Sequence, residues 1–180
     1  MLLWPPPLAF AQAKSFEGPS VAATLVSTKT TIEGSGTSID GSTAGLDLTA
    51  QYNFALAPQF VLGVGLNIGT GNNKAGTDAT PADYITKNRY ALEFTPGYAV
   101  SDTLLVYGKI ASLSATVETT GASEGISGVG YGFGVRGALD KNLFWLAGYD
   151  ANQYTEKTST AMGTYKAKST TLSLGVGYKF

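Results

Sequence analysis

The C-terminal segment TTLSLGVGYKF, residues 170–180, alternates between large apolar side chains and small or polar ones. Successive side chains of an extended strand point to opposite faces, so the two kinds of residue separate. One face carries Leu172, Leu174, Val176, Tyr178 and Phe180, and the other carries Ser173, Gly175, Gly177 and Lys179. This period of two predicts a β-strand with one apolar face.

Similar alternation recurs in seven other segments that are bounded by Gly, Asn, Asp, Ser, Thr or Pro. They are residues 16–31, 44–54, 59–70, 88–100, 103–117, 127–139 and 143–156. The connections alternate in length, with short turns near 57–58, 101–102 and 140–142 and longer polar segments at 32–43, 71–87, 118–127 and 157–166. Such alternation is typical of an up-and-down order. The pattern predicts an all-β protein, an eight-stranded antiparallel up-and-down barrel.

The composition excludes several classes of function. The 180 residues include no cysteine and no histidine, and the net charge is -1. A disulfide scaffold, a thiol nucleophile, a Ser-His triad and a His-ligated metal are therefore excluded. We expect no enzyme activity and no cofactor. Twelve Lys and Arg against 13 Asp and Glu do not provide the basic surface that a nucleic-acid partner requires.

Charged residues make up only 14% of the chain, where roughly 25% is usual for a soluble domain. A soluble lipocalin-like barrel would turn its apolar face inward and a charged face toward water. Here the face opposite the apolar one carries many glycines, which fit a crowded barrel interior. Its isolated polar groups are Asp47, Gln51, Arg89, Glu93, Lys109, Arg136, Asp150 and Lys179. This favours a transmembrane barrel with its apolar face in lipid, and the lipocalin-like binding barrel stays a minor alternative.

Strands of ~10 residues tilted by ~45° span roughly 23–25 Å, the height of a bilayer-facing belt. Unpaired backbone groups are costly in hydrocarbon, so the sheet must close, and eight strands leave an interior that side chains can fill. Asp47, Glu93 and Asp150 would be costly to bury alone. We therefore predict that they pair with the cations of the same face, in a polar network that plugs the lumen. A narrow channel or a lateral route for small molecules is the alternative.

The N-terminal residues 1–13 read MLLWPPPLAFAQA, an apolar stretch that ends in small residues at Ala11 and Ala13. Signal peptidase requires a small-x-small pattern of this kind. We expect a signal-peptide remnant over 1–13 and a barrel domain over 14–180. In the second long connection, Thr80, Pro81 and Asp83 form a helix-start signal, which raises the alternative of a short helix there.

The final residues SLGVGYKF resemble the assembly signal of the small eight-stranded outer-membrane β-barrels of Gram-negative bacteria, the group of OmpA-type transmembrane domains, opacity-type surface proteins and OmpW-like barrels. The residues that carry the resemblance are Ser173, Gly175, Tyr178 and Phe180. It implies location in the outer membrane, contact with its lipid, and recognition by the outer-membrane assembly machinery through strand addition.

The resemblance also implies a monomer with both termini on the periplasmic side. The four long connections, 32–43, 71–87, 118–127 and 157–166, would then face outward and could bind an extracellular ligand. The role expected from the sequence is structural or surface-interactive.

Overall fold

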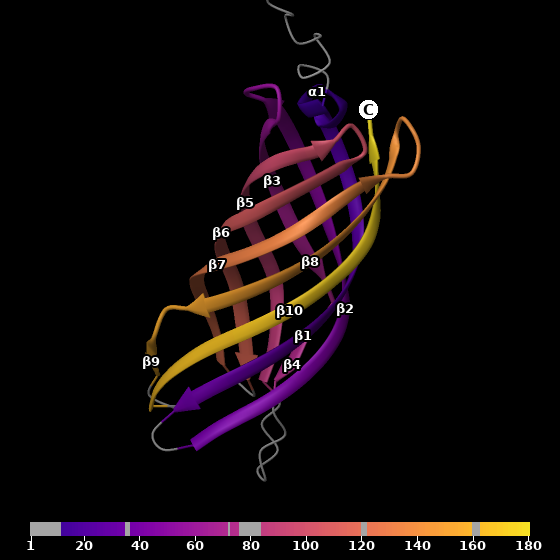
Figure 1. Cartoon of the computed structure of the whole chain (residues 1–180). Coiled ribbons are helices and arrows are strands. Elements are labelled where there is room, and N and C mark those ends of the chain that lie inside the picture. The colour runs from indigo at the N-terminus through magenta and orange to yellow at the C-terminus, as the bar shows by residue number, and fades with distance from the viewer. Residues whose placement is uncertain (1–11, 35–36, 72, 76–83, 120–121, 160–162) are drawn as a thin grey trace, which may run out of the picture.

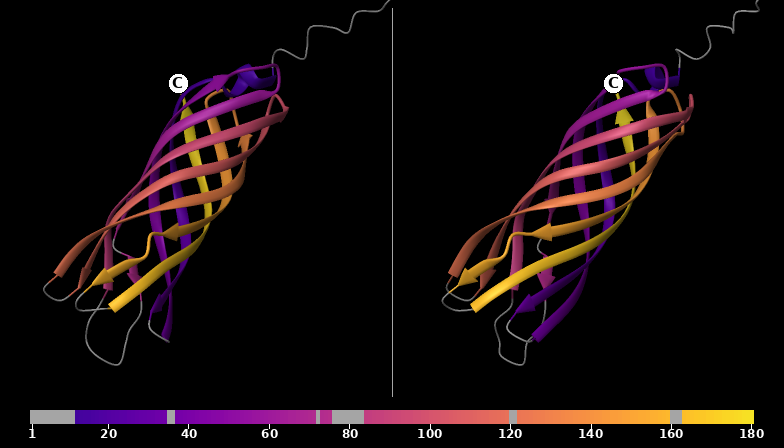
Figure 2. Two further views of the ribbon diagram at one scale, coloured as in Figure 1. Left: turned by 90° about the vertical axis from the view of Figure 1, so that its left-hand side faces the viewer. Right: turned by 60° about the vertical axis from the view of Figure 1, so that its left-hand side comes forward.

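The computed structural model describes residues 12–34, 37–71, 73–75, 84–119, 122–159 and 163–180. Its long strands wind around a common axis, as Figures 1 and 2 show. They are β1 (Gly18–Gly34), β2 (Thr37–Ala55), β3 (Phe60–Thr70), β5 (Tyr84–Ser101), β6 (Leu104–Thr119), β7 (Ala122–Ala138), β8 (Leu143–Tyr154) and β10 (Gly163–Lys179). Two short strands, β4 (Asn73–Ala75) and β9 (Lys157–Ser159), pair with β5 and β10.

Each long strand pairs antiparallel with its neighbours in the chain, and the sheet closes on itself. The order is β1-β2-β3-β5-β6-β7-β8-β10, and β10 returns to β1. The closing register runs from Ser20 opposite Lys179 to Gly34 opposite Tyr165. Closure leaves neither β1 nor β10 as a free edge. The expected eight-stranded up-and-down barrel is confirmed.

The large apolar side chains point away from the barrel axis. Leu25, Phe133 and Leu172 are 68%, 66% and 62% exposed, whereas their strand neighbours Thr24 and Thr171 are buried inside. This is the reverse of a soluble barrel, in which the apolar side chains line the interior. The lipocalin-like alternative is therefore wrong, and the outward face is suited to lipid.

One end of the barrel carries the short turns after β2, β5 and β7, together with the C-terminus (Figure 1). We call it the turn end. Aromatic rings on its outer rim lie in pairs, with centroids 4.7–5.7 Å apart: Tyr52 with Phe54, Phe60 with Tyr98, and Tyr178 with Phe180. Tyr98 also donates a hydrogen bond from its hydroxyl to Gln59 at 2.7 Å. Rings with a polar tip at this height suit a membrane interface.

At the other end, the strands extend as paired arms, and we call it the arm end. The prediction of loops over 32–43 and 118–127 is wrong for most of these residues, because β1 and β2 stay paired to Gly34 opposite Thr37, and β6 and β7 to Thr119 opposite Ala122. The connection 71–87 likewise contains β4 and the start of β5, and 157–166 contains β9 and the start of β10. The helix-start signal at 80–83 lies outside the described residues.

Polar cross-strand contacts explain why the arms are strands. Thr31 and Lys29 of β1 both contact the carboxylate of Asp40 on β2, at 2.8 and 3.3 Å. Lys168 of β10 pairs with Glu33 of β1 at 2.9 Å. Threonine favours strands, and opposite charges on neighbouring strands stabilise their pairing, so a polar sequence here is compatible with a sheet.

A short helix, α1 (Gln12–Phe16), precedes β1 and lies against the turn end (Figure 1). Ala13 and Phe16 are buried in a small apolar cluster with Val61, Ala99 and Leu105. Among the described residues, no helix is long and apolar enough to cross a membrane. The contacts of Ala13 and Phe16 place α1 at one mouth of the barrel.

Candidate functional site: the polar lumen

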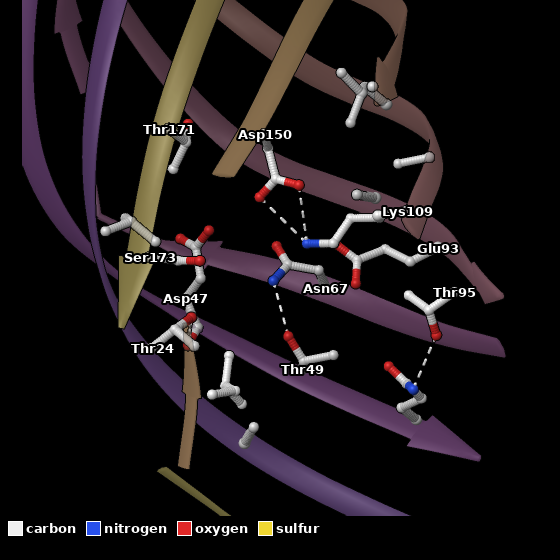
Figure 3. A pocket seen from close by; sticks show the side chains of 18 of the residues that line it. Thr24, Asp47, Thr49, Asn67, Glu93, Thr95, Lys109, Asp150, Thr171 and Ser173 are labelled. Carbon is white, nitrogen blue, oxygen red and sulfur yellow. Dashed lines mark hydrogen bonds and ion pairs between the residues drawn. The ribbon is translucent and has the colours of Figure 1, made fainter. Parts of the chain in front are cut away.

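The lumen is crossed by a buried ion-pair triad. Lys109 of β6 places its Nζ atom 3.3 Å from Glu93 Oε1 on β5 and 3.2 Å from Asp150 Oδ1 on β8. The three side chains are 18%, 7% and 14% exposed. Figure 3 shows Lys109 between the two carboxylates. The triad thus links the neighbouring strands β5 and β6 to β8, which is not adjacent to either of them in the sheet.

A second ion pair lies on the other side of the lumen. Arg89 of β5 donates from Nη2 to Asp47 Oδ1 of β2 at 2.9 Å, and both side chains are more than four-fifths buried. The strand is irregular just before Arg89, where Asn88 has a φ of 50° and the register with β6 shifts. Asparagine tolerates this left-handed conformation, and such a bulge re-aims the side chains beside it.

Two glycines make room for these charges. A β-carbon on Gly69 of β3 would overlap the guanidinium of Arg89, and one on Gly132 of β7 would overlap the carboxylate of Asp150. The glycine-rich inward faces of β3 and β7 are therefore required by the bulk of the side chains that lean over them.

Neutral polar groups extend the network on both sides of the charges. Asn67 donates to the hydroxyl of Thr49 at 2.9 Å. Nearer the turn end, Gln51 donates to Asn53 and, at 3.1 Å, to Thr95. Asn67 and Thr95 were not among the predicted network residues. Both stand at inward positions of alternating strands, and that alternation was the signal that could have found them.

Arg136 and Lys179 lie apart from the carboxylates. The guanidinium carbon of Arg136 lies 3.5 Å from the centroid of the Phe144 ring, in a cation–π contact. Lys179 donates from Nζ to the main-chain oxygen of Ser15 in α1 at 2.6 Å. Of the eight predicted network residues, the structure brings Asp47 and Arg89 together, joins Glu93, Lys109 and Asp150, and places Gln51 beside Asn53 and Thr95.

A cavity of about 130 Å³ remains between these groups, with both ion-paired clusters in its lining (Figure 3). Arg89 Nε donates no hydrogen bond to another described residue, and Asp150 Oδ1 accepts none, although Asp150 Oδ1 lies in the ion pair with Lys109; both atoms are buried. A polar cavity of this size suits a few water molecules. In the part of the chain that the structure describes, no three His, Cys, Asp or Glu side chains cluster in a way that could hold a metal.

The outer surface carries a second hollow, an open groove of about 430 Å³ over β5, β6 and β7. Its lining includes Pro96 and Gly108 together with the aromatic residues Phe60, Tyr98 and Phe133. The register between β5 and β6 is unshifted from Phe94 opposite Ile110 to Gly97 opposite Tyr107, but the ladder pairing is interrupted at Thr95 and Pro96 between them. Proline has no N–H to donate to the ladder, which accounts for a gap at this point.

Known proteins share this barrel architecture. The family model described as "outer membrane protein beta-barrel domain" matches residues 7–180. No curated protein sequence matches the chain. Similar solved structures include Ail of Yersinia pestis in complex with the heparin analogue sucrose octasulfate, with 16% identity and a TM-score of 0.59 over 91% of this chain and 99% of that one.

Two further similar structures have the same overall shape. Neisserial surface protein A is 21% identical with a TM-score of 0.54, over 91% of this chain and all of that one. OprG of Pseudomonas aeruginosa is 15% identical with a TM-score of 0.55, over 91% of this chain and 96% of that one. At these identities the likeness concerns the fold alone.

Proposed function

The chain belongs to the outer-membrane β-barrel protein family and lies in the bacterial outer membrane, and we propose that its lumen is closed. We also propose that it presents its strand arms at the cell surface. The turn end then faces the periplasm. The proposed role is structural or surface-interactive, and no catalytic role is part of it.

The ion-paired layer across the lumen is the observation that carries this proposal. A solute moving along the axis would have to separate Lys109 from Glu93 and Asp150, or pass the Asp47–Arg89 pair. Separating buried ion pairs leaves charges uncompensated, which costs several kcal/mol. The cavity between the pairs, about 130 Å³, is a local void within a filled interior.

The arms supply the proposed contact surface, and their chemistry limits the partner. Ail was solved with a heparin analogue, which is a polyanion. In this chain, three of the described lysines of the arms are paired with carboxylates: Lys29 with Asp40, Lys87 with Glu118, and Lys168 with Glu33. Such neutralised pairs do not attract a polyanion strongly. We therefore propose a partner that is recognised by hydrogen bonding to hydroxyl-bearing strands.

The C-terminal strand is proposed to serve in biogenesis. Ser173 and Gly175 face inward, while Tyr178 and Phe180 are exposed on the outer rim, at 43% and 70%. Before β10 closes on β1, this strand has a free edge to which the assembly machinery can add a strand of its own. We propose that the folded product is a monomer, since closure leaves β1 and β10 paired with each other.

Single-channel recording in planar bilayers tests the closed lumen. The purified protein, refolded in detergent, should resist unfolding by SDS at room temperature and should remain electrically silent after insertion. Steady unitary openings from material that runs as the folded form on the same gel would contradict the proposal.

A lateral route for small apolar molecules is the second candidate, and the gap in the ladder at Pro96 favours it. Tyr107 lines both the lumen cavity and the outer groove, and its ring lies over Gly134 of β7, so we propose that this residue separates the two hollows. Faster uptake of small apolar solutes into liposomes that hold the barrel, and faster still with Tyr107→Ala, would support this candidate. Equal uptake with and without the barrel would exclude it.

A further inference from the structure

The helix α1 is tied to the turn end by main-chain and side-chain contacts. The N–H of Ala13 donates to the carbonyl of Pro58 at 3.0 Å, and the carbonyl of Phe16 accepts from Asn53 Nδ2 at 3.1 Å. Asn53 is only 1% exposed, and this hydrogen bond to α1 supplies a partner for its buried side-chain amide. These contacts come from the turn after β2 and from the inward face of β2.

The contacts begin at Gln12. Its side-chain oxygen accepts a hydrogen bond from Gln59 at 3.1 Å, and the next residue, Ala13, is only 1% exposed. A chain that began at Lys14 would lose the Gln12 contact, the Ala13–Pro58 hydrogen bond and the burial of the Ala13 side chain. The exposed residue Lys14 would then start the chain, and Phe16 would be the only α1 side chain left in the apolar cluster.

The leader offers a second small-x-small pattern two residues earlier, at Ala9-Phe10-Ala11. Signal peptidase reads the unfolded chain, so both patterns satisfy its requirement for small side chains. The two products differ in the folded barrel, because of these two cuts only the one after Ala11 leaves the whole of α1 in the mature chain.

We propose that signal peptidase hydrolyses the peptide bond between Ala11 and Gln12, so that the mature chain begins at Gln12 and α1 seals the periplasmic mouth of the barrel. One water molecule is consumed, leaving a carboxylate on Ala11 and an amine on Gln12. The proposal concerns processing and goes beyond the proposed function, which a different start of the chain would leave standing.

Digestion of the full chain with purified signal peptidase, in a detergent that keeps the chain unfolded, tests this cut. Intact mass and N-terminal sequencing should give a product that starts at Gln12. A product that starts at Lys14, or no cleavage, would overturn the proposal.

Two variants of the precursor separate the two patterns. Ala9→Glu removes a small residue from the first pattern only and should abolish the cut before Gln12. Ala13→Phe removes one from the second pattern only and should leave that cut unchanged, and since the chain is unfolded in this assay, the loss of packing at Ala13 does not enter. The opposite result for either variant would contradict the assignment.

The sealing role has its own measurement. Barrels refolded from chains that start at Gln12 and at Lys14 are heated in SDS and compared by their shift on a gel. The longer chain should keep its folded mobility to a higher temperature, because α1 stays attached through Ala13 and Gln12. Identical temperatures would show that these two residues contribute nothing to the folded barrel.

Discussion

Gly132 on β7 and Asp150 on β8 face each other across the strand pair, and a β-carbon on Gly132 would occupy the position of the Asp150 carboxylate. The glycine is therefore the complement of a buried charge. The same relationship joins Gly69 to the guanidinium of Arg89. In a barrel this narrow, these two bulky polar groups each require a residue without a side chain next to them.

Replacing Gly132 by Val should displace Asp150 from Lys109. Overpacking of this kind costs about 1–3 kcal/mol, so the urea midpoint of unfolding in lipid vesicles should fall. Gly125→Val on the same strand is the matched control, because no heavy atom lies within 4 Å of a β-carbon there. Equal effects of the two substitutions would count against the crowded lumen.

Lys109→Met should leave Glu93 and Asp150 without their shared cation. All three side chains are at least four-fifths buried, and breaking a buried pair in this way costs about 3–5 kcal/mol. Equilibrium unfolding in vesicles measures the loss. Lys87→Met is the control, since the Lys87–Glu118 pair is more than a third exposed on average and should contribute about 0–1 kcal/mol. A Lys109 variant as stable as the control would refute the triad's role.

Leu174→Arg should place a charge in the lipid near the middle of β10. The side chain is 62% exposed on the outer face, and such a substitution costs roughly 2–4 kcal/mol at the bilayer midplane. Leu139→Arg, equally exposed but in the turn after β7, should cost about 0–1 kcal/mol, because it lies near the interface. If both variants unfold at the same urea concentration, the proposed depth of β10 in the membrane is incorrect.

The hydroxyl of Thr31, followed by Lys29, holds the pKa of Asp40 below its ordinary value of 3.8. Because the folded-state pKa is lowered, the contribution of these contacts is present above the unfolded pKa and is lost as the pH falls through the folded pKa. Carboxyl chemical shifts of Asp40, followed in detergent micelles by NMR, should titrate below that value and move upward in Thr31→Val. An unmoved titration in Thr31→Val, or an equal shift in Thr30→Val, would show that the hydroxyl is not the cause.

Deleting Phe180 should lower the amount of barrel assembled in the outer membrane of cells. The ring is 70% exposed and lies 5.1 Å from that of Tyr178, so its removal leaves the lumen network intact. Refolding into detergent, which needs no assembly machinery, is the control and should be nearly unchanged. Normal assembly in cells would remove the support for a C-terminal signal.

The sequence was sufficient for the strand number, the strand order and the identity of the two faces. Alternation such as that of Leu172, Ser173 and Leu174 is a local property, since the direction of a side chain in a strand depends only on its position. The glycines opposite the apolar residues indicated a crowded interior for the same reason. The prediction of loops at the arm end is wrong because a polar composition does not by itself end a strand. Thr31 and Lys29 both contact Asp40 and stabilise the strand pairing across the arm.

Only the tertiary structure decided which inward charges meet. Asp47 and Arg89 are 42 residues apart in the chain, and Lys109 and Asp150 are 41 apart, so their contact depends on register and closure rather than on any local pattern. The register of β7 against β8 sets Arg136 over Phe144, and closure of β10 on β1 brings Lys179 to the helix α1. The faces of a strand follow from its own residues, but the partner of a charge inside a barrel follows from how every strand is shifted against the next.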